Sequence, residues 1–209
     1  MKYLTLLLFP VLLLCAMPAK AEKGFAIGGR FGTLGAGFEV TKALTKRSRL
    51  RVGVNAFTFG TSFNEAGISY DVDLRSRNAS VIFDYHPLNG RFRVSAGVFY
   101  NKNEFDADAS GALTIGGNPY VTSLNANVSF DRTSPYIGIG WGNAVKEGKR
   151  LTHSFDLGLM YQGSPKVELR ASNPAVTQAD LNQEALELED ALSSFRYYPV
   201  ISYGISFKF

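Results

Sequence analysis

Residues 197–209 read Tyr197-Tyr198-Pro199-Val200-Ile201-Ser202-Tyr203-Gly204-Ile205-Ser206-Phe207-Lys208-Phe209. The odd positions of this stretch are apolar or aromatic, whereas its even positions from Ser202 onward are small or polar. Such period-two alternation predicts a β-strand with one apolar face. A lipid-embedded barrel strand needs an apolar outer face, a polar inner face and aromatic residues at the membrane edge. We therefore expect a membrane-insertion signature made of Tyr203, Ile205, Phe207 and Phe209.

The other end of the chain carries a predicted export signal. A basic residue and an apolar run precede Ala19-Lys20-Ala21, which offers small residues at the two positions that a signal peptidase reads. This pattern predicts a secretory signal peptide over residues 1–21, cleaved before Glu22. A lipoprotein signal ending at Cys15 is the alternative, although Leu14 is larger than the residue usual before such a cysteine. A strand of a soluble sandwich could alternate like the C-terminal one, but it would not account for an export signal.

Composition fits one barrel domain over residues 22–209. The single cysteine of the 209-residue chain leaves with the signal, which excludes disulfides, thiolate metal sites and cysteine nucleophiles from that domain. The 22 Lys and Arg residues nearly balance 18 Asp and Glu, so no nucleic-acid partner is expected. The 16 Phe, 10 Tyr and 21 Gly residues suit a barrel with an apolar outside and a polar lumen. Beyond the signal, no apolar stretch approaches the length of a transmembrane helix.

Alternation along the rest of the chain predicts a closed, antiparallel, eight-stranded transmembrane β-barrel. The apolar phase slips at Gly32-Thr33, which we interpret as a tight turn between two strands; one bulged strand is the alternative. A second slip within residues 68–85 predicts a bulge near residues 76–78. The expected connections are short periplasmic turns at 45–48, 86–90 and 145–149, and longer extracellular segments at 61–67, 102–124 and 163–194.

The last of these segments contains the one expected helix. Thr177-Gln178-Ala179-Asp180 resembles a capping box, and leucine and alanine follow at helical spacing. The opposite face is acidic, with no basic residue: Asp180, Glu184, Glu187, Glu189 and Asp190. We expect an amphipathic helix in the last extracellular loop, with a solvated acidic face. Two alternatives are an extracellular partner bound at this face and attraction of Ca²⁺ or Mg²⁺; no metal site is predicted.

Charged residues also fall on faces predicted to point into the barrel, and we expect them to form a lumen charge network: Glu39, Arg51, Asp84, Arg93, Asp156 and Lys208. Buried charges must pair, because removing each from water costs several kcal/mol. An eight-stranded barrel is only wide enough for its own side chains to fill. The sequence therefore predicts a plugged, salt-bridged interior, which disfavours a general diffusion porin.

The two histidines offer little support for catalysis. His153 and Ser154 are neighbours on a predicted strand, so they point to opposite faces and cannot easily act as a pair. Asp84 and His86 share a face beside a turn, where a hydrogen bond in the lumen is the simpler interpretation. We therefore predict no catalytic residue and no cofactor. The alternative functions are a lipid A-modifying enzyme and a surface-binding protein that uses the acidic helix.

Several motifs resemble those of a group of proteobacterial outer-membrane β-barrel proteins in the porin-like superfamily: Gly32-Thr33-Leu34-Gly35-Ala36-Gly37, Asp84-Tyr85-His86-Pro87, Pro135-Tyr136-Ile137-Gly138-Ile139-Gly140-Trp141-Gly142, Gly163-Ser164-Pro165-Lys166-Val167 and the closing strand. The resemblance covers nearly all of residues 22–209. It implies a barrel in the outer membrane of a Gram-negative bacterium, and it brings no catalytic residues. The expected partners are outer-membrane lipid, lipopolysaccharide and the barrel-assembly machinery. We expect a non-enzymatic role that supports the envelope or passes a small apolar ligand sideways into the membrane.

Overall fold

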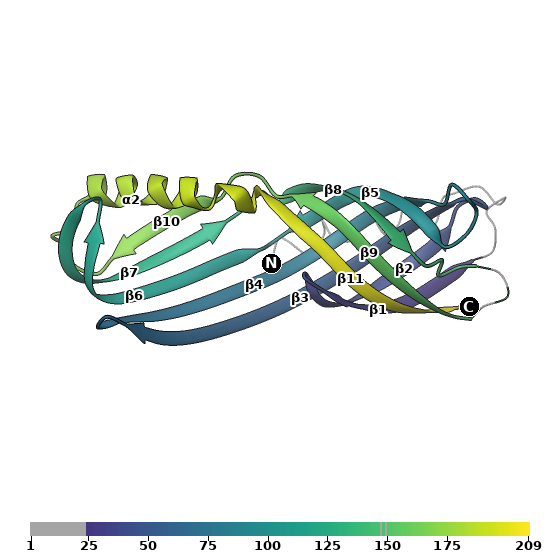
Figure 1. Cartoon of the computed structure of the whole chain (residues 1–209), viewed down its shortest axis with the longest axis horizontal. Helices are drawn as coiled ribbons and strands as arrows, with labels where there is room; N and C mark the ends of the chain where they lie inside the picture. The colour runs from purple at the N-terminus through teal and green to yellow at the C-terminus, as the bar shows by residue number, and fades with distance from the viewer. Residues whose placement is uncertain (1–23, 147, 149) are drawn as a thin grey trace, which may run out of the picture.

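Eight antiparallel strands form a ring (Figure 1). The computed structural model describes residues 24–146, 148 and 150–209; the predicted signal peptide, residues 1–21, lies outside the described residues. Each ring strand pairs with the next, and the last pairs with the first. The order is β1(Phe25–Gly32), β2(Gly35–Ala43), β3(Ser48–Glu65), β4(Ile68–Tyr85), β5(Phe92–Asn101), β8(Thr133–Trp141), β9(Leu151–Tyr161) and β11(Tyr197–Lys208). The prediction of two strands on either side of Gly32-Thr33 is confirmed.

Beyond the ring, a branch of the same eleven-stranded sheet continues from two of the ring strands. The far halves of β3 and β4 pair onward to β6(Glu104–Ile115), β7(Asn118–Ser129) and β10(Lys166–Ala171), in the order β3-β4-β6-β7-β10. The helix α2(Gln178–Ala191) lies along β10, and the 3-10 helix η2(Ser193–Arg196) leads into β11. We call this branch of the sheet and α2 the extension. Figure 1 shows it at the left, with the ring at the right.

Two sequence predictions about β3 and β4 are wrong. Residues 61–67 are not a loop, because β3 runs to Glu65 and pairs with β4 as far as Ile68. The predicted bulge near residues 76–78 is absent, since the register of this hairpin is continuous along its whole length. The hairpin turns at Ala66-Gly67, where both residues have positive φ angles of 50° and 81°, as a tight hairpin turn requires.

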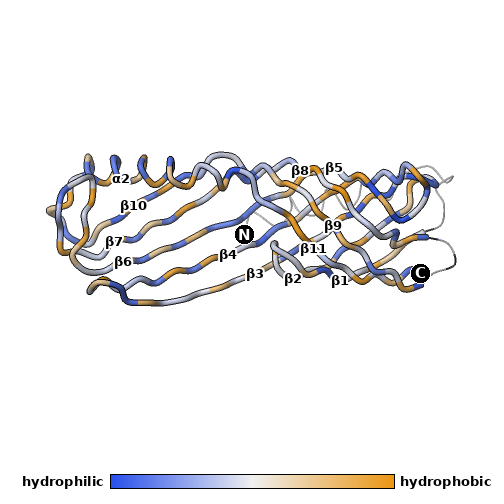
Figure 2. Tube along the Cα trace, viewed as in Figure 1, coloured by the Kyte–Doolittle hydropathy of each residue, from blue (hydrophilic) through white to orange (hydrophobic). Residues whose placement is uncertain are grey.

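A change of environment, rather than a bulge, explains the apparent slip of the apolar phase. Within the ring, the lumen side of β3 carries Arg49 and Arg51 and the outer side carries Val52 and Val54. Beyond Ala56, the side that continues the lumen face becomes apolar and the other side becomes polar. The inner face of the extension half carries Phe57, Phe59 and Phe63 on β3 and Ile68, Tyr70, Val72 and Leu74 on β4. Figure 2 shows the alternation of hydropathy along both strands.

The outside of the ring is an apolar belt with aromatic pairs at its two edges. At the end with short connections, which we call the turn end, Phe25 lies 6.2 Å from Phe209 between ring centroids. At the opposite edge, Tyr161 lies 5.4 Å from Tyr197. Large apolar side chains between these edges are about half exposed, including Val81, Leu157 and Ile205. No helix in the described ranges is both long enough and apolar enough to cross a membrane.

Side chains fill the ring in layers. A small apolar cluster of Ala26, Ala43 and Val145 closes the turn end. A larger apolar layer lies toward the extension and consists of Leu34, Ile82, Phe99, Tyr136, Met160 and Val200. The ring of Tyr136 fits there because Gly158 has no side chain; a Cβ atom at Gly158 would lie 2.5 Å from Cε2 of that ring. The charged residues of the lumen lie between these two apolar layers.

Candidate functional site

Three arginines and three carboxylates form a network across the lumen. Arg30 Nη1 lies 2.5 Å from Glu39 Oε2, and Arg51 Nε lies 2.6 Å from Asp84 Oδ2. Asp156 accepts hydrogen bonds from Arg30 and from Arg93 Nη2, the latter at 2.7 Å. Asp156 and Asp84 are almost wholly buried, with side-chain exposures of 1% and 2%. The six formal charges balance, so each buried ion has the partners that its desolvation requires.

Five of the six residues predicted for this network lie together, and one does not. Lys208 lies at the turn end, where its Nζ donates to the carbonyl oxygen of Lys146 at 3.5 Å. Arg30 is the member that the sequence prediction omitted. The signal for it was present, because Arg30 has the opposite parity to Phe25, Ile27 and Phe31, which all point outward.

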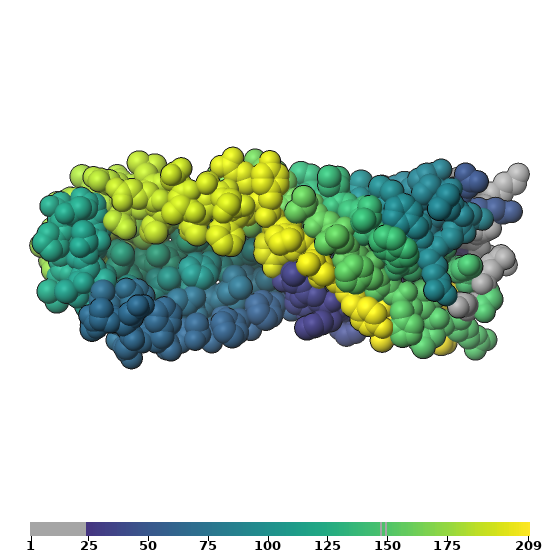
Figure 3. All heavy atoms as spheres, in the orientation of Figure 1, coloured from purple at the N-terminus to yellow at the C-terminus, as the bar shows by residue number. Residues whose placement is uncertain are grey.

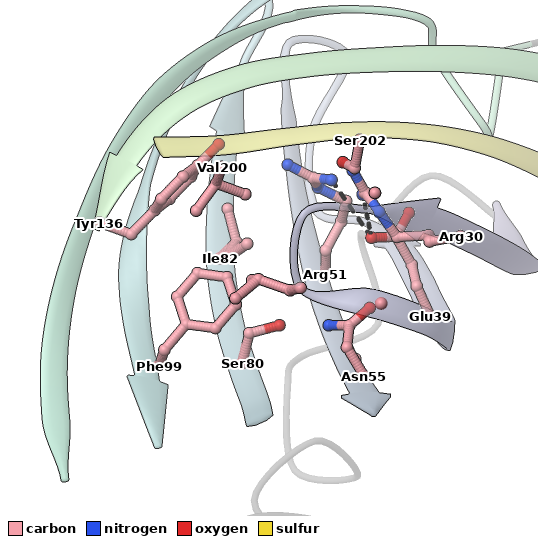
Figure 4. Close-up of a pocket in the computed structure, with 14 residues that line it drawn as sticks. Arg30, Glu39, Arg51, Asn55, Ser80, Ile82, Phe99, Tyr136, Val200 and Ser202 are labelled. Atoms are coloured by element: carbon pink, nitrogen blue, oxygen red, sulfur yellow. Dashed lines mark hydrogen bonds and ion pairs between the residues drawn. The ribbon is translucent and has the colours of Figure 1, made fainter. Parts of the chain in front are cut away.

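The apolar layer above the network leaves almost no free space. A cavity of about 30 Å³ lies between the two, lined by Arg30, Glu39 and Arg51 on one side and by Ile82, Phe99 and Tyr136 on the other (Figure 4). This volume has room for about one water molecule. At this level, the described side chains of the network and of the apolar layer therefore leave only a small cavity between them.

A layer of amides covers the same apolar layer on the side of the extension. Asn101 and Gln162 each lie two residues beyond a member of the apolar layer on their strands. Asn103 Nδ2 donates to Gln162 Oε1 at 3.1 Å, and Asn78 Nδ2 donates to Asn103 Oδ1 at 3.0 Å. All four amides are buried. Charged, apolar and amide layers thus follow one another along the interior of the ring.

The extension continues this interior as an open, curved sheet. The five strands direct one face toward the same side as the lumen, and we call that face the trough. Cross-strand partners in the trough are apolar, as with Leu74 and Phe105, Phe105 and Val128, and Val128 and Val167. The opposite face is polar; there, Asn127 Nδ2 donates to Asp106 Oδ1 at 2.6 Å. In Figure 3, β6 and β7 lie set back between α2 and the β3–β4 hairpin.

Aromatic side chains in the trough remain open to solvent. Phe59 is 54% exposed and Phe63 is 46% exposed, although both lie on the concave side of the sheet. Phe63 stacks on Tyr70 at 5.0 Å between ring centroids. Contiguous exposed apolar surface of this kind usually marks a site of binding.

The acidic helix α2 docks on the sheet through the carboxylates that were predicted to be solvated. Glu189 Oε1 accepts a hydrogen bond from the backbone N–H of Val167 at 3.0 Å, and Glu184 Oε2 accepts one from Gly116 N–H at 3.1 Å. The prediction of a fully solvated acidic face is therefore wrong for these residues. Glu189 satisfies an amide of the edge strand β10, where open N–H groups would otherwise invite pairing with another chain, and Glu184 satisfies an amide in the β6–β7 turn.

The first turn of α2 is fixed in the same manner. Thr177 caps the helix as predicted, since its Oγ1 accepts from Asp180 N–H at 3.2 Å. Asp180 also accepts from the Tyr120 hydroxyl at 2.7 Å, and this bond, followed by that from Thr177, lowers the pKa of the carboxyl group. The same bond raises the pKa of Tyr120. This contact is therefore retained at neutral pH; it is lost when the pH falls through the lowered pKa of Asp180 or rises through the raised pKa of Tyr120.

We expect the Glu189→Ala substitution to loosen α2 without affecting the ring. The Val167 amide loses its acceptor, which costs about 1 kcal/mol locally. Hydrogen exchange followed by mass spectrometry will then show faster exchange in β10 and α2, and unchanged exchange in β1 and β11. The matched control is Glu187→Ala, because Glu187 is exposed and its carboxylate contacts only Gln183 of α2 itself among the bonds of the described residues. Equal acceleration in both variants would contradict this docking role.

Among the described residues, the two histidines lie in different places and on different faces of the ring. His153 points outward and its Nδ1 lies 2.6 Å from the Tyr203 hydroxyl, whereas Ser154 points into the lumen. His86 is buried at the turn end, where its backbone N–H donates to Arg47 O at 2.8 Å. In the part of the chain that the structure describes, acidic and histidine side chains form no group of three placed to hold a metal ion.

Comparison with known proteins supports the fold. No protein-family model matches the chain, and no curated protein matches it by sequence. Among solved structures, Acinetobacter baumannii CarO2 is similar with a TM-score of 0.62 and 23% identity, over 89% of this chain and 98% of that one. Acinetobacter baumannii CarO is similar with a TM-score of 0.59 and 22% identity, over 88% and 97%. The chain therefore has the β-barrel fold of these proteins, as its resemblance to porin-like outer-membrane barrels implied.

Proposed function

We propose that this protein is an outer-membrane barrel that does not conduct through its lumen and that binds an amphiphile in the trough. The apolar belt and its two aromatic edges suit a ring embedded in a bilayer. The predicted signal peptide would send the chain out of the cytoplasm. With the turn end in the periplasm, the extension stands outside the cell, where the trough faces water.

One observation carries the binding proposal: the apolar face of β3 and β4 changes sides where the strands leave the ring. Near the tip of the extension this apolar face is covered, because Leu181 of α2 packs there with Ile115. On β3 and β4, a polar inner face would be the simplest arrangement for strands in contact with water. Instead, Phe57, Phe59, Phe63 and Leu74 lie on this face and are 36–54% exposed. Burying apolar surface against a hydrocarbon chain gains about 25 cal/mol per Å². The amide and charged layers block the direct path to the periplasm, so the trough is a binding surface and not the mouth of a pore.

Charge narrows the chemistry of this ligand. Acidic residues outnumber basic ones in the extension, over residues 57–77, 102–134 and 163–196. An anionic head group would be repelled by this field, whereas an uncharged or cationic head group would not. The ligand that fits is a single-chain amphiphile with a hydrocarbon tail and a head group that is not anionic.

Photolabelling and conductance together test this proposal. The probe is a monoacylglycerol with a twelve-carbon chain that carries a diazirine near its end, added to the full-length protein in lipid nanodiscs. We expect labelled peptides from β3, β4, β6 and β7 on the trough side, and weaker labelling by the fatty acid of equal chain length. Planar bilayers should show no steady conductance. A large steady conductance, or labelling confined to the outer belt, would overturn the proposal.

A further inference from the structure

The outer wall of the ring contains a groove where the rest of the belt is covered by large side chains. It has a volume of about 550 Å³ and lies across β11, β1, β2 and β3. Its floor is made by the small residues Gly29, Ala36 and Ala56, and its sides by Phe31, Phe38 and Tyr203. This volume falls in the range of about 300–1,000 Å³ that ligand pockets occupy.

The groove is a property of these particular residues. A Cβ atom added at Gly29 would meet no other atom within 4 Å in the described part of the chain, so an outward side chain would fit there without strain. The equivalent outward positions on other ring strands carry residues such as Val81, Val98 and Leu157. An outward glycine in a lipid-facing belt makes no side-chain contact with lipid. Here, its lack of a side chain leaves the groove between aromatic residues.

The groove and the trough meet at the lowest point of the ring. β1 and β2 are joined only by Thr33 and Leu34, whereas β3 and β4 continue past the ring into the extension. β2 pairs with β3 only as far as Ala36 and Ala56. Beyond Ala56, the only partner of β3 among the described strands is β4, so the trough is open on the side of the short β1–β2 turn. Ala56 lines the groove, and the next residue, Phe57, lies in the trough.

We infer that this groove is the exit site for the hydrocarbon chain of the amphiphile held in the trough. This inference rests on the proposed function. The chain passes over the lip formed by Thr33 and Leu34 and lies between Phe31, Phe38 and Tyr203, in direct continuity with the lipid-facing belt. The occupant is a single alkyl chain, because the lining is mostly apolar, with Arg30 and Asn55 as its polar members, and is open to the bilayer. Because the lumen is blocked, the alkyl chain leaves the trough on the side of the short β1–β2 turn.

Gly29→Phe tests the inference because it fills the groove in open space. The full-length protein is reconstituted in phospholipid vesicles, and transfer of a pyrene-labelled twelve-carbon monoacylglycerol from water into the lipid is followed by stopped-flow fluorescence. We expect wild type to accelerate transfer over protein-free vesicles and Gly29→Phe to lose most of this acceleration. Trough labelling by the diazirine probe should be unchanged. The matched control is Val81→Phe, on the lipid-facing side of β4, which should transfer like wild type.

The outcomes separate the two proposals. Normal trough labelling with undiminished transfer by Gly29→Phe would overturn the exit site and leave the proposed function standing. Equal loss of transfer in Gly29→Phe and Val81→Phe would also overturn it, because the effect would then belong to the belt in general. Absence of trough labelling in wild type would overturn the proposed function and the exit site together.

Discussion

Replacing Asp156 with alanine is expected to destabilise the protein by about 3–5 kcal/mol. Asp156 is 1% exposed and contacts Arg30, Arg51 and Arg93. Its removal leaves three buried guanidinium groups with only two carboxylates, and each unpaired charge keeps its desolvation cost. Urea unfolding in lipid vesicles, followed by the fluorescence of the single tryptophan, Trp141, will measure the change in the free energy of unfolding.

An exposed ion pair supplies the control for this experiment. Glu168 lies 3.8 Å from Arg170, and their side chains are 73% and 81% exposed. The Glu168→Ala substitution should change the free energy of unfolding by no more than about 1 kcal/mol, because solvated ion pairs contribute little.

The double variant Asp156→Ala/Arg93→Ala should lose less unfolding free energy than the sum of the losses in its two single variants, because the two charges are coupled. A mild Asp156→Ala variant would mean that the lumen holds enough water to solvate its charges.

This network gives the lumen the character of a buried protein core, in which every charge is paired. In a water-filled pore, charges can stay solvated and need no partners. Here, apolar side chains lie on both sides of the network, so the only compensation available to each ion is another ion or a hydrogen-bonding group. Stability and the proposed absence of conductance therefore depend on the same residues.

The ring was predictable from the sequence because its chemistry is periodic. Every ring strand alternates between lipid and lumen, and the hairpin turns are short, so local pattern was enough to place them. The extension was harder to predict for a physical reason. When β3 leaves the ring, the surroundings of both its faces change, and the apolar residues move from Val54 on one face to Phe57 on the other. Sequence alone reads this change as a slip of the strand, since it cannot show where the bilayer ends.

The candidate site could be predicted only where it depends on contacts between side chains and not on the backbone. The charged residues of the lumen could be predicted because they occupy the inward-facing positions of alternating strands. The same rule would have identified Arg30. The role of Glu189 could not be foreseen, because its partner is a backbone amide at the edge of β10. The amino-acid sequence does not show which strand lies at the edge of the sheet. Pairing of β4 with β6 is likewise set by the three-dimensional arrangement, with Tyr70 opposite Ala109.

The trough can be tested with two neighbouring residues that face opposite sides of one strand. We expect Phe59→Glu to weaken binding of the twelve-carbon monoacylglycerol by at least about tenfold, which corresponds to about 1.4 kcal/mol. Phe59 is 54% exposed in the trough, and a bound alkyl chain would cover it. A carboxylate covered in this way would lose hydration without gaining a partner, which costs free energy only in the bound state. Native mass spectrometry of detergent-released protein will give the relative affinities.

Thr58→Glu is the matched control, because Thr58 lies on the polar face of the same strand, opposite Arg75 in β4. Both variants gain one negative charge in the same segment, so they alter the long-range field almost equally. Thr58→Glu should therefore bind the monoacylglycerol within about twofold of wild type, since a charge left in water costs little. The comparison separates contact with the hydrocarbon chain from a general effect of charge. If both variants lost affinity equally, the aromatic face of the trough would have no part in binding, and the acidic field of the extension would be the cause.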